Sequence, residues 1–348
     1  MVGDADHFSS VTNPLLSIII TCYNYENYVC SAIDSVLDQG CDFVELIVVD
    51  DGSSDRSWER ISSYGDRLKA VSIENGGAVR ASLHGFGLSS GQFVYFLDAD
   101  DTMKPGSLAV IRSHLSDRVA KIQFALAPID PSGAVIGPDF PKLNGRHRSE
   151  DLRRLIALKG TYLTPPTSGN VYRRDVYSEL GDLSYERGID GIAYLLAPFV
   201  GEVISIPRSL ASYRIHDKSL SAFSAVTAGR VDWYTQRFMN RLKHLSELLA
   251  AKGIRYEVLH PDRAFAYVLE NEILATSLRG ERIPWRKLLQ YARSVYTEEA
   301  TPKRELFALM YLVLAVVPHR LANELILFRV NQTRYPWIRR ILKSLTQL

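Results

Sequence analysis

Cysteine is scarce in this sequence, and its spacing is not that of a metal site. The 348 residues contain three cysteines, Cys22, Cys30 and Cys41, and no C-x-x-C pair. We therefore expect reduced thiols rather than disulfides or zinc ligands, which is the usual state of cysteine in the cytoplasm. The first ten residues, MVGDADHFSS, also lack the basic and apolar segments of a secretory signal. Both absences predict a cytoplasmic location.

Glycine-rich phosphate loops and long apolar runs are missing as well. Neither G-x-x-x-x-G-K-S/T nor G-x-G-x-x-G occurs, so the signatures of P-loop and dinucleotide-binding proteins are absent. The apolar run LFALMYLVLAVV, residues 306–317, covers 12 residues. Because a helix needs about 20 apolar residues to cross a bilayer, we expect this run to form a buried helix.

Basic residues are rare in the first part of the chain. Residues 1–101 hold 16 Asp and Glu but only 5 Lys and Arg, although the whole chain has a net charge of +2. The later part is therefore strongly basic. This asymmetry has two interpretations: the basic part contacts something anionic, such as a membrane surface or a phosphorylated ligand, or the two parts neutralise each other on folding.

The first hundred residues alternate β-rich runs with helical patterns. The expected strands cover residues 15–21, 43–50, 68–73 and 92–98, and the expected helices cover 27–39, 55–64 and 77–90. Alternation at this spacing predicts an α/β fold with a mostly parallel sheet, right-handed crossovers and flanking helices. Ligands of such sheets bind beyond the carboxyl ends of the strands.

The alternation of strands and helices becomes irregular after residue 101, and the sequence is mostly helical after about residue 221. The expected helices are one from about Pro105, then 150–159, 174–180, 190–197, 226–252, 262–278, 285–296 and 304–317; the expected strands are 121–127, 202–206 and 210–215. We predict a tail (1–14), an α/β domain (15–220, with halves 15–101 and 102–220) and a helical region (221–348).

Three carboxylates follow the fourth expected strand. In the segment FVYFLDADD these are Asp98, Asp100 and Asp101. If the chain stays extended, Asp98 and Asp100 point to one face. Two carboxylates at one point suit Mg²⁺ or Mn²⁺, and a divalent cation would remove their mutual repulsion. The alternative interpretation is an acidic turn that caps the following helix.

Polar residues also follow the other strands. Asp50 and Asp51 end the second strand, and a carboxylate there could accept hydrogen bonds from a nucleobase or a ribose hydroxyl. The first strand ends in TCYNYENY, and ENGGAVR, after the third, contains two glycines that allow close approach to the backbone. The parallel sheet would bring all these residues to one edge.

These segments together resemble a known family. LLSIIITCYNYENYVCSAIDSVLDQ, ELIVVDDGSSD, ENGGAVRASLHGF and GQFVYFLDADDTMKPGSL, in this order, are similar to the motifs of family 2 glycosyltransferases with the GT-A fold. The similarity continues through PPTSGNVYRRDVYSELG and GIDGIAYLLAPFVGEVISIPRSLASYRIHDKSLS, and covers about residues 15–221. In the third motif, Ala78 and Leu83 replace residues common in close relatives.

The resemblance implies a role for individual residues. It implies that Asp51 faces the base of the nucleotide, that Asp100 binds the metal directly and that Asp98 contacts ribose or groups bound to the metal. The implied nucleotide-sugar set is Thr21, Tyr23, Asn24, Asp50, Asp51, Asn75, Gly76, Asp98, Ala99 and Asp100. The implied catalytic base is Asp190, with Glu186 as a nearby competitor. His216 would join Asp98 and Asp100 at the metal, and Ser168, Gly169 and Asn170 would line the acceptor side.

The implied activity is an inverting sugar transfer that depends on Mg²⁺ or Mn²⁺. The donor would be a nucleoside-diphosphate sugar, most commonly a UDP-sugar, and the acceptor a hydroxyl of a glycan or lipid-linked molecule in surface-polysaccharide synthesis; no nucleic acid is expected. The basic segment YPWIRRILKSL suits either a helix on the inner face of the membrane or one docked on the protein body. Two alternatives remain: a sugar-nucleotide-binding protein without transfer, and a nucleotidyltransferase, although TCYNYENY lacks the basic residues of the latter.

Overall fold

The computed structural model describes residues 14–145, 148–216, 227–255 and 265–299, together with Leu309, Leu312, Val317, Pro318 and Leu321. The chain divides into two compact units. Met1–Arg153 and Tyr162–Ala222 form the first, called here the sheet unit, and Arg154–Thr161 and Phe223–Leu348 form the second, the helical unit. The expected helix at 304–317 and the basic segment near the end of the chain lie outside the described residues, apart from the single positions named above.

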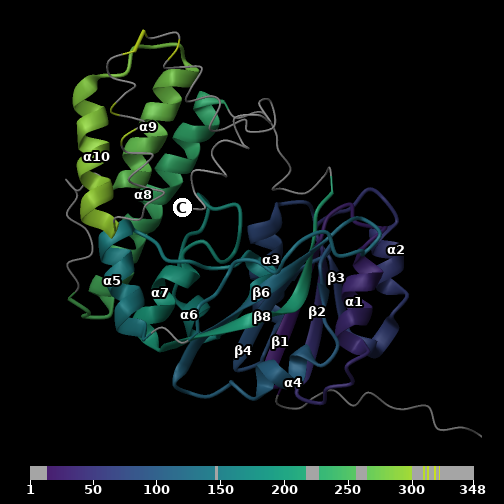
Figure 1. The fold of residues 1–348 in the computed structure, drawn as a ribbon. Helices are drawn as coiled ribbons and strands as arrows, with labels where there is room; N and C mark the ends of the chain where they lie inside the picture. Colours follow the sequence, from purple (N-terminus) through teal and green to yellow (C-terminus); the bar gives the residue numbers. More distant parts are fainter. Residues whose placement is uncertain are drawn as a thin grey trace, which may run out of the picture. The chain divides into compact units, whose positions relative to one another are not determined.

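The sheet unit is built on one eight-stranded mixed sheet, in the order β3-β2-β1-β4-β7-β6-β8-β5 (Figure 1). Its strands are β1 (Leu16–Cys22), β2 (Val44–Asp50), β3 (Lys69–Ser72), β4 (Phe93–Asp98), β5 (Thr102–Met103), β6 (Val119–Ile129), β7 (Asn170–Arg173) and β8 (Glu202–Arg214). The β3-β2-β1-β4 half is parallel, as the strand–helix alternation predicts. The short strands β5 and β7, which the sequence pattern misses, are antiparallel to their neighbours.

Helices cover both faces of the parallel half. Ile18 and Ile20 of β1 share a buried cluster with Val29 and Ile33 of α1 (Val29–Leu37) and with Ile61 of α2 (Ser57–Ser62). On the opposite face, Gly85 of α3 (Ala78–Leu88) lies so close to Ile19 that a Cβ atom would be 2.5 Å from its Cγ2. Because neither face of β1 meets water, its sequence is continuously apolar rather than alternating.

One expectation for the second half of the sheet, that of two separate strands near its end, is wrong. The predicted strands at 202–206 and 210–215 form one strand, β8, which runs parallel to β6. The register shifts where Ile206 pairs with Phe124 but Ser209 pairs with Ala125, so Pro207 and Arg208 form a bulge. The other helices of the sheet unit are α4 (Ser107–Arg112), α6 (Asp175–Ser178) and α7 (Ala193–Val200), whereas α5 (Ser149–Lys159) begins in the sheet unit and ends in the helical unit.

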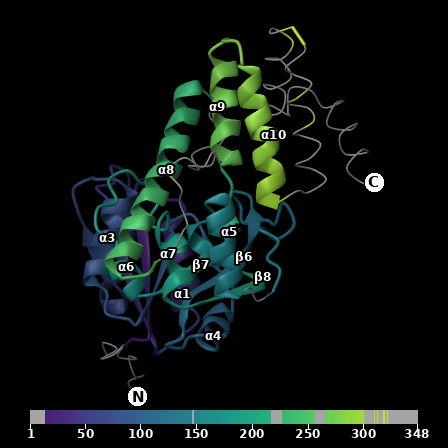
Figure 2. The same ribbon diagram turned by 90° about the vertical axis from the view of Figure 1, so that its left-hand side faces the viewer.

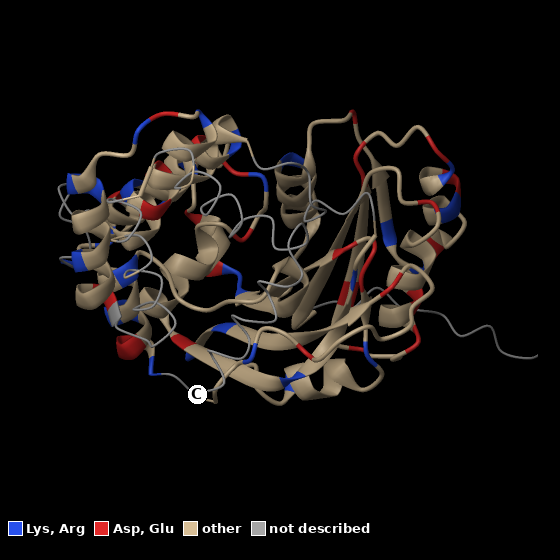
Figure 3. Cartoon of the chain, turned by 45° about the horizontal axis from the view of Figure 1, so that its top comes forward, with Lys and Arg blue, Asp and Glu red and all other residues tan. Residues whose placement is uncertain are grey.

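The helical unit contains three long helices in its described part, near the positions that the sequence predicts. These are α8 (Ala228–Ala251), α9 (Ala266–Leu278) and α10 (Trp285–Glu299), and α9 packs against both of the others (Figure 2). Leu269 and Ile273 of α9 form a buried cluster with Leu288, Tyr291 and Val295 of α10. Over the described residues, no helix is both long and apolar enough to cross a membrane. Basic (blue) and acidic (red) residues both occur on the helices, and acidic residues also recur along the loops of the sheet unit (Figure 3).

Candidate functional site

The acidic residues after β4 lie at the carboxyl edge of the sheet, as predicted. The register places Thr21 beside Asp98 and Cys22 beside Asp50, so the ends of three parallel strands meet at this edge. The assumed extended conformation is wrong, however. The amide of Asp101 donates a hydrogen bond to the carbonyl of Asp98 over 3.0 Å, so the chain turns immediately after β4.

The three carboxylates have different environments. Burial raises the pKa of Asp98 to about 7, and the negative charges of Asp100 and Asp190 act in the same direction. Asp101 is 1% exposed, and burial raises its pKa well above its usual range. One of its oxygens accepts the amide of Arg214 over 2.8 Å, and the other has no partner among the described residues. It does not cap α4, whose N-cap is Gly106.

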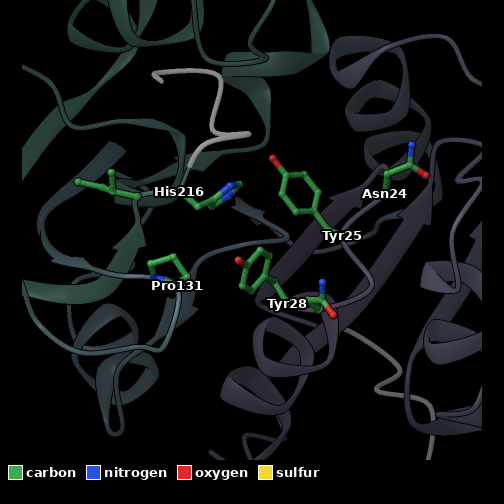
Figure 4. A pocket seen from close by; sticks show the side chains of 7 residues that line it. Asn24, Tyr25, Tyr28, Pro131 and His216 are labelled. Carbon is green, nitrogen blue, oxygen red and sulfur yellow. The ribbon is translucent and has the colours of Figure 1, made fainter. Parts of the chain in front are cut away.

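Asp100 is paired with a histidine. Its Oδ2 lies 2.9 Å from Nε2 of His216, which follows β8. The ring of His216 is stacked on that of Tyr28, with centroids 5.2 Å apart, and meets the edge of Tyr25 at 5.8 Å. These three rings lie together beside a cavity of about 410 Å³ (Figure 4). Tyr25 and Tyr28, which sequence reasoning did not assign to the site, therefore hold the imidazole beside Asp100.

A second cavity, of about 540 Å³, contains most of the predicted nucleotide residues. It is lined by Thr21, Cys22, Tyr23, Asn24, Tyr25, Asp51, Asn75, Gly77, Ala78, Ala81, Asp98, Ala99, Asp100 and Tyr213. Asp50 and Gly76 are the two predicted residues outside this lining. The buried carboxylate of Asp50 instead accepts hydrogen bonds from the Ser53 amide and the Ser72 hydroxyl, which hold the turn after β2.

Asp51 holds the loop between β3 and α3 in place. Its two carboxylate oxygens accept the amides of Gly76 and Gly77, each over 2.8 Å, and its carbonyl accepts the side-chain amide of Asn75. Asn24 has a similar role for the loop after β2: it adopts a left-handed conformation (φ 59°), and its Oδ1 accepts the amide of Ser54 over 2.8 Å. These two side chains shape the walls of the cavity in addition to lining it.

Asp190 lies in the segment before α7 and is half-buried. The hydroxyl of Thr167 donates to its Oδ1 over 3.4 Å. Its charge contributes to the raised pKa of Asp98, so the structure brings together two acids that are far apart in the sequence. The competing acid, Glu186, is buried and lines a third cavity, of about 580 Å³, between the start of α3 and residues 181–187.

The predicted acceptor residues are buried at the end of the loop before β7 and at the first residue of that strand. The Ser168 hydroxyl accepts the Asp98 amide over 3.1 Å, and its carbonyl accepts the hydroxyl of Tyr95. Asn170 donates to the carbonyls of Pro165 and Pro166. Both side chains are 1% exposed or less, and neither lines one of the three cavities. In this structure they connect the loop to the end of β4.

The carboxylate oxygens at this edge suit a hard divalent cation. No group of three or more potential ligands is already assembled among the residues that the structure describes. Asp100 and His216 nevertheless supply a carboxylate and an imidazole 2.9 Å apart, and Asp98 lies at the same edge. Mg²⁺ and Mn²⁺ sites often use one or two carboxylates and complete the coordination with substrate phosphates and water. The residues therefore fit such an ion.

Comparison with known proteins shows which family the sequence matches and which solved structures have a similar fold. The model of glycosyl transferase family 2 matches residues 17–181. An uncharacterized glycosyltransferase of Nostoc sp. is 34% identical over 223 residues, which are 61% of this chain and 69% of the relative. The minor teichoic acid biosynthesis protein GgaA of Bacillus subtilis is 36% identical over 171 residues, 46% of this chain and 37% of that protein. Among solved structures, S. aureus TarS 1-349 in complex with UDP-GlcNAc has a TM-score of 0.53 at 17% identity, covering 89% of this chain and 90% of that chain.

Proposed function

The chain belongs to glycosyltransferase family 2, and from this premise we propose that it is an inverting, metal-dependent enzyme. It would transfer a sugar from a nucleoside-diphosphate sugar to a hydroxyl of a glycan or lipid-linked acceptor. The observation that carries the proposal is the meeting of Asp98, Asp100 and His216 with Asp190 at one edge of the sheet. Residues 15–220 would form the catalytic domain, and residues 221–348 an attached helical region.

One side of the site would bind the leaving group. Asp100 and His216 would hold a Mg²⁺ or Mn²⁺ ion, with Asp98 beside them. When bound, a divalent cation stabilises the negative charge that develops on the departing diphosphate. Tyr25 and Tyr28 keep the His216 ring in place, and Arg214 donates to the Asp100 carbonyl over 2.8 Å. These contacts fix the positions of the two proposed ligands.

The other side would activate the acceptor. Asp190 would accept the proton of the attacking hydroxyl as general base, and attack from the face opposite the diphosphate inverts the anomeric carbon. A carboxylate can do this only while it is ionised. The Thr167 hydroxyl orients the Asp190 carboxylate.

A UDP-sugar is the proposed donor. The cavity of about 540 Å³ is large enough for a nucleotide and is lined by Thr21, Tyr23 and Asp51, the residues proposed to bind its base and ribose. The UDP-GlcNAc complex of TarS, a protein with a similar fold, supports this choice. The name of the relative GgaA supports an acceptor in cell-surface polymer synthesis.

Two substitutions test the proposed roles of the acids. Asp100→Ala should abolish metal-dependent transfer, and Asp190→Asn should abolish transfer while donor binding remains. The readouts are the release of nucleoside diphosphate and the thermal stabilisation of the protein by UDP-sugars with Mn²⁺. Asp66→Asn, which changes an exposed acid of the sheet unit, is the matched control. Near wild-type turnover in either site variant would refute that role, and donor binding without transfer in the wild type would favour the non-transferring alternative.

Membrane contact is a separate proposal. Residues 333–348 lie outside the described residues, and their basic, amphipathic sequence suits the anionic inner face of a membrane. Deleting these residues should release the protein from vesicles that contain anionic lipid, as measured by co-sedimentation. Equal binding of the truncated and the full chain would refute this proposal without affecting the proposed chemistry.

A further inference from the structure

The cavity of about 580 Å³, called here the third cavity, has no part in the binding of the nucleotide or the metal. It lies between the start of α3 and residues 181–187, within the sheet unit. The residues predicted for the acceptor side, Ser168, Gly169 and Asn170, are buried and line none of the three cavities. An acceptor therefore needs another place to bind, and the third cavity offers one.

The third cavity adjoins both the nucleotide cavity and the proposed base. Gly77 and Ala78 line the third cavity and also the nucleotide cavity of about 540 Å³, so the two meet at the start of α3. On the other wall, Arg187 is followed directly by Gly188, where a Cβ atom would lie 3.4 Å from Oδ1 of Asp190. A ligand of the third cavity is therefore beside the donor and near the Asp190 carboxylate.

One wall is an apolar face of α3 that does not pack on the sheet. The buried residues of this helix, on its sheet side, are Ala81, Ser82 and Gly85. Val79 and Leu83, which are one helical turn apart, line the third cavity instead, and Leu83 is 37% exposed. Ala78 and Leu83, the two positions at which the third sequence motif differs from close relatives, both line this cavity. Packing of the fold does not account for this apolar face.

The facing wall is a turn that is held by its own hydrogen bonds. The carboxylate of Asp182 accepts the amide and the hydroxyl of Ser184, each over 2.8 Å. The amide of Glu186 donates to the carbonyl of Leu183 over 2.9 Å. Leu183, which is 3% exposed, adds apolar surface to this wall. The third cavity is therefore formed by a helix and a structured turn before any ligand binds.

Charged side chains of both signs accompany the apolar surface. Two are arginines, Arg80 and Arg187, and two are acids, Asp182 and Glu186. These four side chains together carry no net charge, so they give an anionic ligand no net attraction. Guanidinium groups only donate hydrogen bonds, whereas carboxylates only accept them. A hydroxyl group both donates and accepts, and is therefore suited to this mixture.

We propose that the third cavity is a saccharide-binding site, which holds an uncharged sugar unit of the acceptor. The C–H groups of a sugar ring would pack on Val79 and Leu83, and its hydroxyls would bond to the charged groups around them, the usual division of apolar and polar contacts in a ligand pocket. That the sugar is the acceptor rests on the proposed function, whereas the binding of a sugar does not. The unit bound here is a neutral hexose of a glycan rather than a phosphate group of a polymer.

The test uses the exposed position of Leu83. Saturation-transfer NMR of the full chain, with UDP and Mn²⁺ present, measures the binding of methyl glycosides of glucose, galactose, N-acetylglucosamine and N-acetylgalactosamine. Leu83→Lys and Leu83→Glu should each weaken this binding by about tenfold, because a charge replaces apolar surface under the ring. Leu88→Lys changes an exposed leucine of the same helix outside the cavity lining and should leave the affinity unchanged.

The outcomes separate this proposal from the proposed function. If none of the glycosides binds the wild type, or if either Leu83 variant binds as the wild type does, the proposal is wrong. Glycerol phosphate tests for an anionic ligand: displacement of the glycoside by it, or its tighter binding to Leu83→Lys, would also overturn the proposal. Glycoside binding that weakens as expected, without UDP release from a UDP-sugar, would leave the site in place and refute transfer. Transfer with an unchanged acceptor KM in the Leu83 variants would retain the proposed function and refute this site.

Discussion

Glu45 gives the most quantitative prediction, because five hydrogen bonds meet at its carboxylate. Its Oε1 accepts the Ser17 hydroxyl, the amide and hydroxyl of Ser90 and the Gly91 amide, and Lys69 donates to Oε2 over 2.9 Å. Glu45 is 9% exposed. These contacts join β1, β2 and the turn before β4 at the amino edge of the parallel strands, opposite the carboxyl edge that holds the site. We therefore expect Glu45 to stabilise the fold without affecting catalysis.

The magnitude follows from the pKa of this carboxyl. Burial alone would raise it, but the hydrogen bonds from Ser17, Lys69 and Ser90 outweigh burial and lower it from 4.5 to about 2. This difference corresponds to about 3 kcal/mol of unfolding free energy at pH 7. Because the folded pKa is the lower one, this contribution is complete above pH 4.5 and disappears as the pH falls through about 2.

The assay is chemical denaturation of Glu45→Gln and the wild type at pH 7 and pH 3, followed by circular dichroism. The difference in unfolding free energy should be about 3 kcal/mol at pH 7 and roughly 1 kcal/mol at pH 3, where the unfolded state already binds the proton. Glu59→Gln, an exposed acid on α2, is the control and should cost little. Equal stability of the Glu45 variant at pH 7, or a difference that does not depend on pH, would refute the reasoning.

Two further changes probe the sheet and the cavity. Gly85→Ala should destabilise the protein by about 1–3 kcal/mol, because the new methyl group would be 2.5 Å from Ile19; an unchanged melting temperature would contradict this close packing. Asp51→Ala should lower the unfolding free energy by about 2–4 kcal/mol, because the amides of Gly76 and Gly77 lose their acceptors. The same change should weaken UDP binding. Calorimetry should show both effects, and an unchanged UDP affinity would contradict the effect on binding.

The strand and helix pattern of the first hundred residues could be predicted because it is local. The run at β1 is continuously apolar because both faces are covered, and this signal needs no knowledge of the partners. Errors arose where tertiary contacts decide the outcome. Asn170–Arg173 is too short to show a strand pattern and becomes β7 only by pairing between β4 and β6. The sequence pattern also divided 202–215 into two strands, but Ile206 and Ser209 both pair with β6, so Pro207 and Arg208 lie in a bulge of one strand, β8.

The candidate site, too, could be predicted only in part. The acids at the strand ends could be located from the sequence, since parallel strands end at one edge. Their individual contacts could not. Asp50 bonds to its own turn, Asp51 binds two glycine amides, and the chain turns after Asp98 where an extended segment was expected. Hydrogen-bond partners depend on loop conformation, which sequence periodicity does not describe.

By itself, the sequence determined the strands and helices of the first hundred residues, where the acids fall at the strand ends and which family the motifs resemble. Only the tertiary structure decided that His216 meets Asp100 and that the charge of Asp190 acts on Asp98. The physical reason is distance along the chain. A residue's preference for strand or helix acts over a few neighbours, whereas a site is made by sheet register and crossovers that bring together residues about a hundred positions apart.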